Sequence, residues 1–169
     1  GIGATTWLLV QRIEHDTLAL QRQIELGEAA RTADMLSRRM VELQRGLRVS
    51  VSQLDVATFT DPARLDGFLE SKPVLLSQFS NLFAAGADGH MLTYADVGGL
   101  RHPTINLSDR DYFRRTLSER RPIVSEPVPG RVSGEPVIIF TQPVVAGERV
   151  IGMIGGALRL ASRDLLGDL

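Results

Sequence analysis

The residues best suited to bind a ligand lie in a charged and aromatic run at positions 109–113. An arginine can hold a carboxylate through two parallel hydrogen bonds, and a tyrosine offers an apolar ring with a polar hydroxyl at its tip. Arg110 and Tyr112 are therefore the first candidates for a binding site. A purely structural interpretation stays open, in which Arg110 pairs with Asp109 or Asp111 and Tyr112 is a core residue.

Several polar side chains elsewhere in the expected sheet region could line the same cavity. Such residues can instead face solvent or neighbouring backbone, so each has two interpretations. The further candidates are Tyr94, His102, Ser125 and Thr141. Phe113 is expected in the core, whereas Arg131 and Arg149 fall in turns and are expected to be solvated.

Motifs of catalysis and of metal binding are missing from the sequence. The three histidines, His15, His90 and His102, are far apart and lack the spacing of metal ligands. There is no Gly-x-Ser-x-Gly elbow and no Gly-Lys-Ser/Thr phosphate loop. The glycines between residues 152 and 156 fall inside an expected strand, which excludes a dinucleotide loop. We therefore expect no catalytic residue, no metal and no cofactor, and the chain is not expected to be an enzyme.

The charge balance and the cysteine count restrict the partners and the compartment. With Lys+Arg 19 and Asp+Glu 20, the chain lacks the basic excess that nucleic-acid binding requires. There is no cysteine, which is compatible with the periplasm. Residues 1–10 are mostly apolar, uncharged and contain the only tryptophan, Trp7. They are interpreted either as the end of a membrane helix with an interfacial aromatic or as a packed helix start.

A long helix is expected over about residues 6–56, because this region has no proline and is rich in helix-forming residues. In its second half apolar residues recur at the spacing of a coiled coil: Leu36, Met40, Leu43, Leu47, Val51 and Leu54. A less regular continuation runs through Leu9, Ile13, Leu20, Ile24 and Ala30. A helix of about 45 residues would be about 70 Å long. We therefore expect it to extend beyond the domain and to pair with a second subunit; a break near Gly27 is the alternative.

The rest of the chain predicts an α+β fold. Asp61 and Pro62 suit the first positions of a helix, which Pro73 ends, and Val74 to about Gln78 form a further short turn of helix. A small helix is expected over residues 109–117, capped by Ser108 or Asp109. Strands are expected at residues 79–85, 90–95, 123–128, 136–145 and 150–160. They form a five-stranded antiparallel sheet with helices on one face and a loop with the small helix on the other. Three glycines in the last strand mark bulges or the close approach of another backbone or of a ligand.

Five segments carry a resemblance to a known family over about residues 60–160. They are Asp88-Gly89, the run at 109–114, Val124-Ser125-Glu126-Pro127, the stretch 134–140 with Pro143-Val144, and the stretch 152–156. In order and spacing they resemble the Cache sensor modules of bacterial receptors, also called PDC or PAS-like modules.

The resemblance implies a periplasmic small-molecule sensor from a membrane-anchored signal-transduction receptor. It is most like the ectodomains of transmembrane diguanylate cyclases, where two such modules often occur in tandem. Sensor histidine kinases, chemoreceptors and ligandless dimerisation modules are the alternatives. The expected organisation is a dimerising helix over residues 1–56, a sensor module over 57–161, and the start of a linker to a second module or membrane segment over 162–169.

Amino-acid-binding members of the family share a motif of Tyr, four residues, Arg, one residue and Trp-Tyr, completed by an Asp on the last strand. Arg110, Tyr112 and Phe113 match the arginine and the two aromatic positions, but Ile105 replaces the first tyrosine. Ala157 falls at or near the position of the last-strand Asp. Without that carboxylate an ammonium group has no obvious partner. The expected ligand is therefore a small organic molecule such as a carboxylate and not an amino acid.

Overall fold

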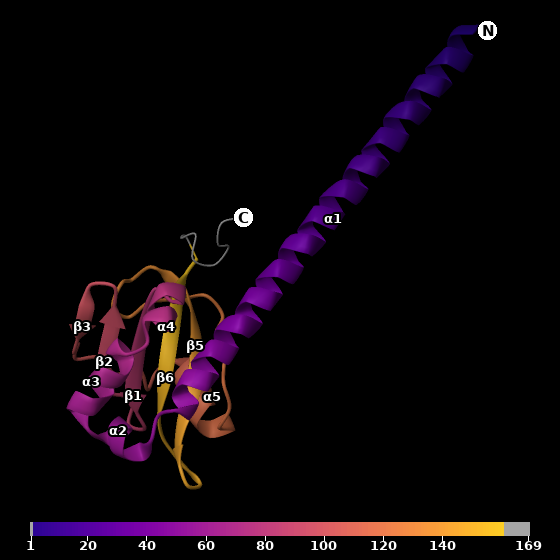
Figure 1. The fold of residues 1–169 in the computed structure, drawn as a ribbon. Helices are drawn as coiled ribbons and strands as arrows, with labels where there is room; N and C mark the ends of the chain where they lie inside the picture. The colour runs from indigo at the N-terminus through magenta and orange to yellow at the C-terminus, as the bar shows by residue number, and fades with distance from the viewer. Residues whose placement is uncertain (1, 161–169) are drawn as a thin grey trace. The chain divides into compact units, whose positions relative to one another are not determined.

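The computed structural model of this chain describes residues 2–160. The chain divides into two compact units, Gly1–Arg39 and Met40–Leu169, so the boundary predicted after residue 56 falls inside the second unit. The segment 162–169, predicted as the start of a linker, lies outside the described residues. Figure 1 shows the elements in chain order.

The first unit consists of one helix, the first part of α1 (Ile2–Ser52). The helix continues through Gly27 without a break. Its large apolar side chains are exposed, among them Trp7, Ile13, Leu20 and Ile24. Over residues 2–160 no helix combines the length and the apolar composition needed to cross a bilayer.

The second unit is built on one antiparallel sheet with the strand order β3-β2-β1-β6-β5-β4. The strands are β1 (Asn81–Gly86), β2 (Met91–Asp96), β3 (Gly99–Arg101), β4 (Val128–Pro129), β5 (Pro136–Ala146) and β6 (Arg149–Arg159). The described residues thus form six strands where five were predicted. The added strand β3 has three residues, too few to show an alternating pattern, and the strand predicted at 123–128 is reduced to β4 and one bridge between Val124 and Phe140.

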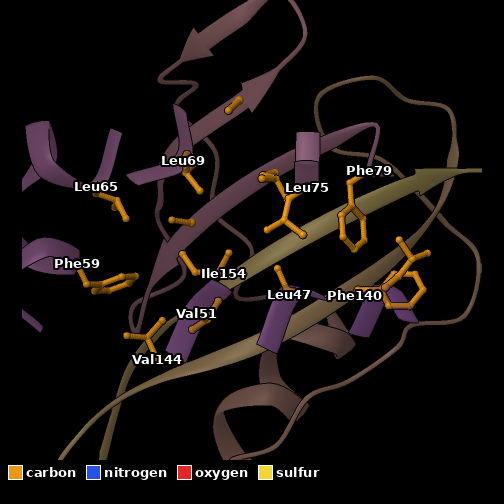
Figure 2. Packing of buried hydrophobic residues seen from close by; sticks show 14 of the residues in the cluster. Leu47, Val51, Phe59, Leu65, Leu69, Leu75, Phe79, Phe140, Val144 and Ile154 are labelled. Atoms are coloured by element: carbon orange, nitrogen blue, oxygen red, sulfur yellow. The ribbon is translucent and has the colours of Figure 1, made fainter. Parts of the chain in front are cut away.

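Three short helices follow α1: α2 (Val56–Thr60), α3 (Pro62–Glu70) and α4 (Pro73–Gln78). The Asp55 carboxylate accepts a hydrogen bond from Thr58 N at 2.7 Å and so caps α2. Asp61 caps α3 in the same way, with Pro62 in the first turn, as the sequence predicted. Buried side chains of these helices pack on the same face of the sheet as the end of α1 (Figure 2).

The apolar stripe in the second half of α1 packs against the chain's own sheet. Leu43 and Leu47 are each 1% exposed, and Val51 is buried beside them. They join a core that includes Phe79 and Phe140, whose rings meet edge to face with centroids 5.6 Å apart. The expectation that this stripe needs a second subunit is therefore wrong for Leu43, Leu47 and Val51, because they are buried in the chain's own core. Figure 2 shows Leu47 and Val51 in this core.

The glycines of β6 leave room for aromatic rings on both faces of the sheet. A Cβ atom on Gly156 would lie 2.6 Å from the ring of Phe79, and one on Gly155 would collide with the ring of Phe83. Phe79 belongs to the helix-covered face and Phe83 to the opposite face. At Gly152 a Cβ atom would meet the backbone oxygen of Ala85, as predicted, whereas at Gly155 and Gly156 the approaching groups are aromatic rings, which the sequence did not predict.

Replacing Leu47 with alanine should lower the free energy of unfolding by about 2–5 kcal/mol, because the cavity left in a tight core is only partly refilled. Val49→Ala is the matched control on the same helix, since Val49 is 50% exposed, and should change stability by no more than about 0.5 kcal/mol. Urea unfolding of both variants measures this. Equal effects at the two positions would contradict the packing of α1 on the sheet.

Candidate ligand-binding site

The second face of the sheet is covered by α5 (Asp111–Glu119) and the loops around it. The helix starts at Asp111, and Arg110 occupies the N-cap position without a side-chain capping bond. The predicted cap by Ser108 or Asp109 is therefore wrong. The carboxylate of Asp109 is engaged elsewhere, by Arg131. Phe113 is 4% exposed in the core of this face, which confirms its prediction.

A small cavity, here called the tyrosine cavity, lies on this face and has a volume of about 30 Å³. Its apolar wall comes from the sheet and the loop before α5, and its polar groups come from Asn81, Tyr94, Tyr112, Arg131 and Ser133. The remaining lining residues are Phe83, Met91, Leu107, Val128, Pro129, Gly130, Val132, Val137, Ile139 and Ala157. A volume of this size has room for about one water molecule.

Two buried tyrosines meet at the tyrosine cavity. Tyr94 is 5% and Tyr112 is 6% exposed, yet neither hydroxyl has a hydrogen-bond partner among the described residues. A buried tyrosine hydroxyl usually finds a partner. Burial raises the pKa of both phenols, and the positive charges of Arg110 and Arg131 partly oppose the rise in the pKa of Tyr112. The two hydroxyls are thus neutral groups that can donate hydrogen bonds to a ligand.

Arg131 is a site residue that the sequence did not reveal. It lies exposed in a turn, as predicted, but it also lines the tyrosine cavity and forms an ion pair with Asp109, which were not predicted. The hydrogen bond from Arg131 lowers the pKa of the Asp109 carboxyl. The two residues are 22 positions apart, and only the fold brings the β4–β5 turn to the start of α5. Local spacing therefore held no signal for this pair.

Arg110 lines a different hollow, the side cavity, of about 220 Å³. The side cavity shares Tyr112 and Val128 with the tyrosine cavity, and its other lining residues are Asp111, Arg115, Ile123, Val124, Ser125 and Glu126. The Nε atom of Arg110 is buried and has no hydrogen-bond partner within residues 2–160. No ion pair joins Arg110 to Asp109 or Asp111 in that range, so the structural pairing considered for it is absent there.

The remaining predicted site residues have structural partners. Ser125 borders the side cavity, but its Oγ accepts a bond from Ile139 N and donates one to Glu126 O, both at 2.8 Å. Thr141 is buried away from both cavities. Its hydroxyl bonds Thr116 at 2.6 Å and the backbone of Ile123. The structure thus corrects the expectation that Thr141 faces a ligand.

His102 also lies outside both cavities. Its Nε2 atom is 2.8 Å from a carboxylate oxygen of Asp66 on α3, and its side chain is 56% exposed. His102 was expected to line the sheet-side cavity, but the loop after β3 turns it toward α3. Of the predicted site residues, Tyr94 and Tyr112 line the tyrosine cavity, and Arg110, Tyr112 and Ser125 line the side cavity.

Ala157, at or near which the resemblance puts the family's last-strand Asp, lies in β6 and lines the tyrosine cavity. None of the described residues that line this cavity carries a carboxylate. The same residues therefore offer an ammonium group no charged partner. Within residues 2–160 no cluster of three or more histidine or acidic side chains could hold a metal ion.

Comparisons with solved structures give the class of this fold. The ligand-binding domain of the amino-acid chemoreceptor PctC of Pseudomonas aeruginosa, in complex with GABA, has a TM-score of 0.68 at 22% identity, over 85% of this chain and 69% of that one. The ligand-binding domain of the Campylobacter jejuni chemoreceptor Tlp3, in complex with 4-methylisoleucine, has a TM-score of 0.66 at 15% identity, over 79% and 56%. PctB of Pseudomonas aeruginosa with L-Arg has a TM-score of 0.62 at 21% identity, over 79% and 52%.

The chain thus has the fold of chemoreceptor ligand-binding domains, and it spans between about half and two thirds of their length. No protein-family profile matches the sequence, and no curated protein matches it. The predicted α+β class with a PAS-like antiparallel sheet is confirmed.

A pH titration tests the environment of the two tyrosines, which are the only ones in the chain. Both folded-state pKa values lie above the ordinary value of 10.0, so the unfolded chain loses these protons first as the pH rises. The free energy of unfolding should be unaffected by these groups below about pH 10 and fall above it. The tyrosinate absorbance, followed in native protein and in urea, measures the shift. Coincident titration curves would contradict the burial, and Tyr112→Phe should remove one of the two shifted groups.

Proposed function

We propose that this chain is the extracytoplasmic small-molecule sensing module of a transmembrane signal-transduction receptor. The observation that carries the proposal is the tyrosine cavity, which is lined by two buried tyrosines whose hydroxyls have no hydrogen-bond partner among the described residues. Its support is the fold, which is that of receptor domains solved with amino acids or GABA bound. The ligand site that we propose combines Tyr94 and Tyr112 with an arginine at the cavity edge.

The sheet offers a physical route from the ligand to the long helix. Phe83 lines the tyrosine cavity, and its neighbour Leu82 on β1 lies in the opposite core with Leu47 and Val51 of α1. A ligand that changes the twist of β1 and β6 would therefore change the packing under α1. It can signal only if it binds two such arrangements with different affinity.

The proposal also covers the cytoplasmic output domain, the oligomeric state and the membrane anchor of the full-length protein. A cytoplasmic diguanylate cyclase is the output favoured by the resemblance of the sequence, and a histidine kinase or a chemoreceptor is the alternative. The exposed apolar residues of α1 between Trp7 and Ile24 support a homodimer through this helix. We also infer that the full-length protein is anchored in the inner membrane and presents this module to the periplasm.

A thermal-shift screen over small carboxylates, amines, sugars and amino acids tests the sensing function. A ligand at about 100 times its Kd should add about 2.7 kcal/mol of stability, or roughly 10 °C in Tm for a domain of this size. Tyr112→Phe should reduce the shift, because it removes a hydroxyl that faces the ligand. If Arg110→Ala leaves the shift unchanged, Arg110 is not part of the site. No stabilisation by any compound class would favour a ligandless dimerisation module.

Sedimentation of the wild-type chain and of Leu20→Glu tests the dimer. Leu20 is 59% exposed on the helix, and a buried glutamate at a helix seam should raise the dimer dissociation constant at least about tenfold. Gln21→Glu adds the same charge one position along α1 and is the control. A wild-type chain that stays monomeric, or a dimer that tolerates Leu20→Glu as well as Gln21→Glu, would contradict assembly through this face.

A further inference from the structure

We propose that Arg131 is the ligand anchor of the tyrosine cavity, that it takes the carboxylate of a small monocarboxylic acid without an amino group, and that this carboxylate displaces Asp109. The inference rests on the proposed sensing function and names its ligand class. Four features of the cavity and of the turn beside it bear on this proposal.

The first feature is the position of the two guanidinium groups. Arg131 lines the tyrosine cavity, whereas Arg110 lines the side cavity, which is also lined by Tyr112. Arg131 is the only positively charged side chain among the described residues around the tyrosine cavity. An anionic head group in this space would therefore meet Arg131 and the hydroxyl of Tyr112.

The second feature is the carboxylate that Arg131 already binds. Asp109 is paired with Arg131, and its side chain is 66% exposed against 32% for Arg131. Exposed ion pairs are weak, so a ligand carboxylate held also by Tyr112 can replace this one. The exchange keeps the charge of Arg131 neutralised throughout. It also frees Asp109, which is joined to the start of α5, from the β4–β5 turn.

The third feature is the composition of the lining. A carboxylate would meet Arg131 at one end, and its carbon chain would meet apolar side chains such as Phe83, Met91 and Ile139. An ammonium group among these apolar side chains would meet no carboxylate of the described lining residues, because Asp109 lies at the Arg131 end. A desolvated and unpaired ammonium group is costly, which selects against acids that carry an amino group at the end away from the carboxylate.

The fourth feature is the size of the cavity. A volume of about 30 Å³ is too small for even a three-carbon acid. The turn that carries Arg131, with a positive φ of 73° at Gly134, must therefore move outward when a ligand enters. Displacement of Asp109 removes the ion pair that holds this turn against α5. Binding and loosening of the turn are thus one event.

Calorimetric titration with propionate tests the proposal, with propionamide and β-alanine as probes of the same chain length. Propionate should bind, propionamide should lose the charge-assisted contact, and β-alanine should be rejected for its ammonium group. Arg131→Gln should weaken propionate binding at least about tenfold. Asp109→Asn should strengthen it by up to about fivefold, because the competitor loses its charge.

Two control variants separate these effects from general changes in charge. Arg149→Gln removes an exposed arginine at the first position of β6, and Asp88→Asn removes a carboxylate whose exposure, 70%, is similar to that of Asp109. Both should bind propionate as the wild type does. Urea unfolding of Arg131→Gln should match the wild type, and Asp109→Asn supplies an independent gain in affinity that a misfolded variant could not show.

Three results would overturn the proposal. The first is propionate binding that Arg131→Gln and Arg149→Gln affect equally, and the second is an Asp109→Asn variant that binds more weakly than the wild type. The third is a wild-type protein that ignores acetate, propionate and butyrate. In that third case, stabilisation by another compound class in the thermal-shift screen would still support the sensing function. No stabilisation by any compound would contradict both the sensing function and the role of Arg131.

Discussion

The structure depends on the contact of aromatic rings with the glycines of β6. This strand pairs with β1 on one side and with β5 on the other, so it lies at the centre of the sheet. Phe79 packs over Gly156 on the helix-covered face, and Phe83 packs over Gly155 on the face of the tyrosine cavity. A side chain at either glycine would push a ring outward. The core under α1 and the floor of the cavity are therefore positioned by the same short segment of backbone.

The proposed site and the core under α1 lie on opposite faces of this central strand. One face of β1 and β6 is held by leucines of α1 and by α3 and α4, in a core with large, fully buried side chains. The other face carries Tyr94 and Tyr112, whose hydroxyls have no protein partner among the described residues. The first face is packed tightly, and the second has unsatisfied polar groups at a cavity. The proposed ligand site thus lies on the face of the sheet opposite to the core that α1, α3 and α4 cover.

The fold was predictable because most of its signals are local. Asp61 and Pro62 predict the start of a helix from their own side chains. Asp88-Gly89 predicts a chain reversal, which lies between β1 and β2 with a φ of 89° at Gly89. The apolar stripe of α1 was found, but spacing alone could not tell whether a second helix or the chain's own sheet covers it. Strand β3 was missed because three residues show no alternation.

The candidate site was only partly predictable, because its parts come from distant segments. Tyr94 and Tyr112 were identified by residue type, and they do share a cavity. Arg131 looked like an ordinary turn arginine until the fold placed it beside Asp109. His102 and Thr141 had the right chemistry, but the backbone turns them to Asp66 and to Thr116 instead. Residue chemistry selects candidates, and strand register decides which of them meet.

The two outermost strands of the sheet have a consequence for the behaviour of the domain in a crowded compartment. β3 has three residues and β4 has two, and β4 includes Pro129, which has no amide hydrogen to donate. β4 and the bridge at Val124 cover residues 136–141 of β5, and the rest of that edge, residues 142–146, is interrupted by Pro143. Another chain thus finds only short or interrupted lengths of backbone at which to extend the sheet by strand addition, the usual route to aggregation through exposed edges. These edges favour sheets that stay separate when copies of the domain are close together.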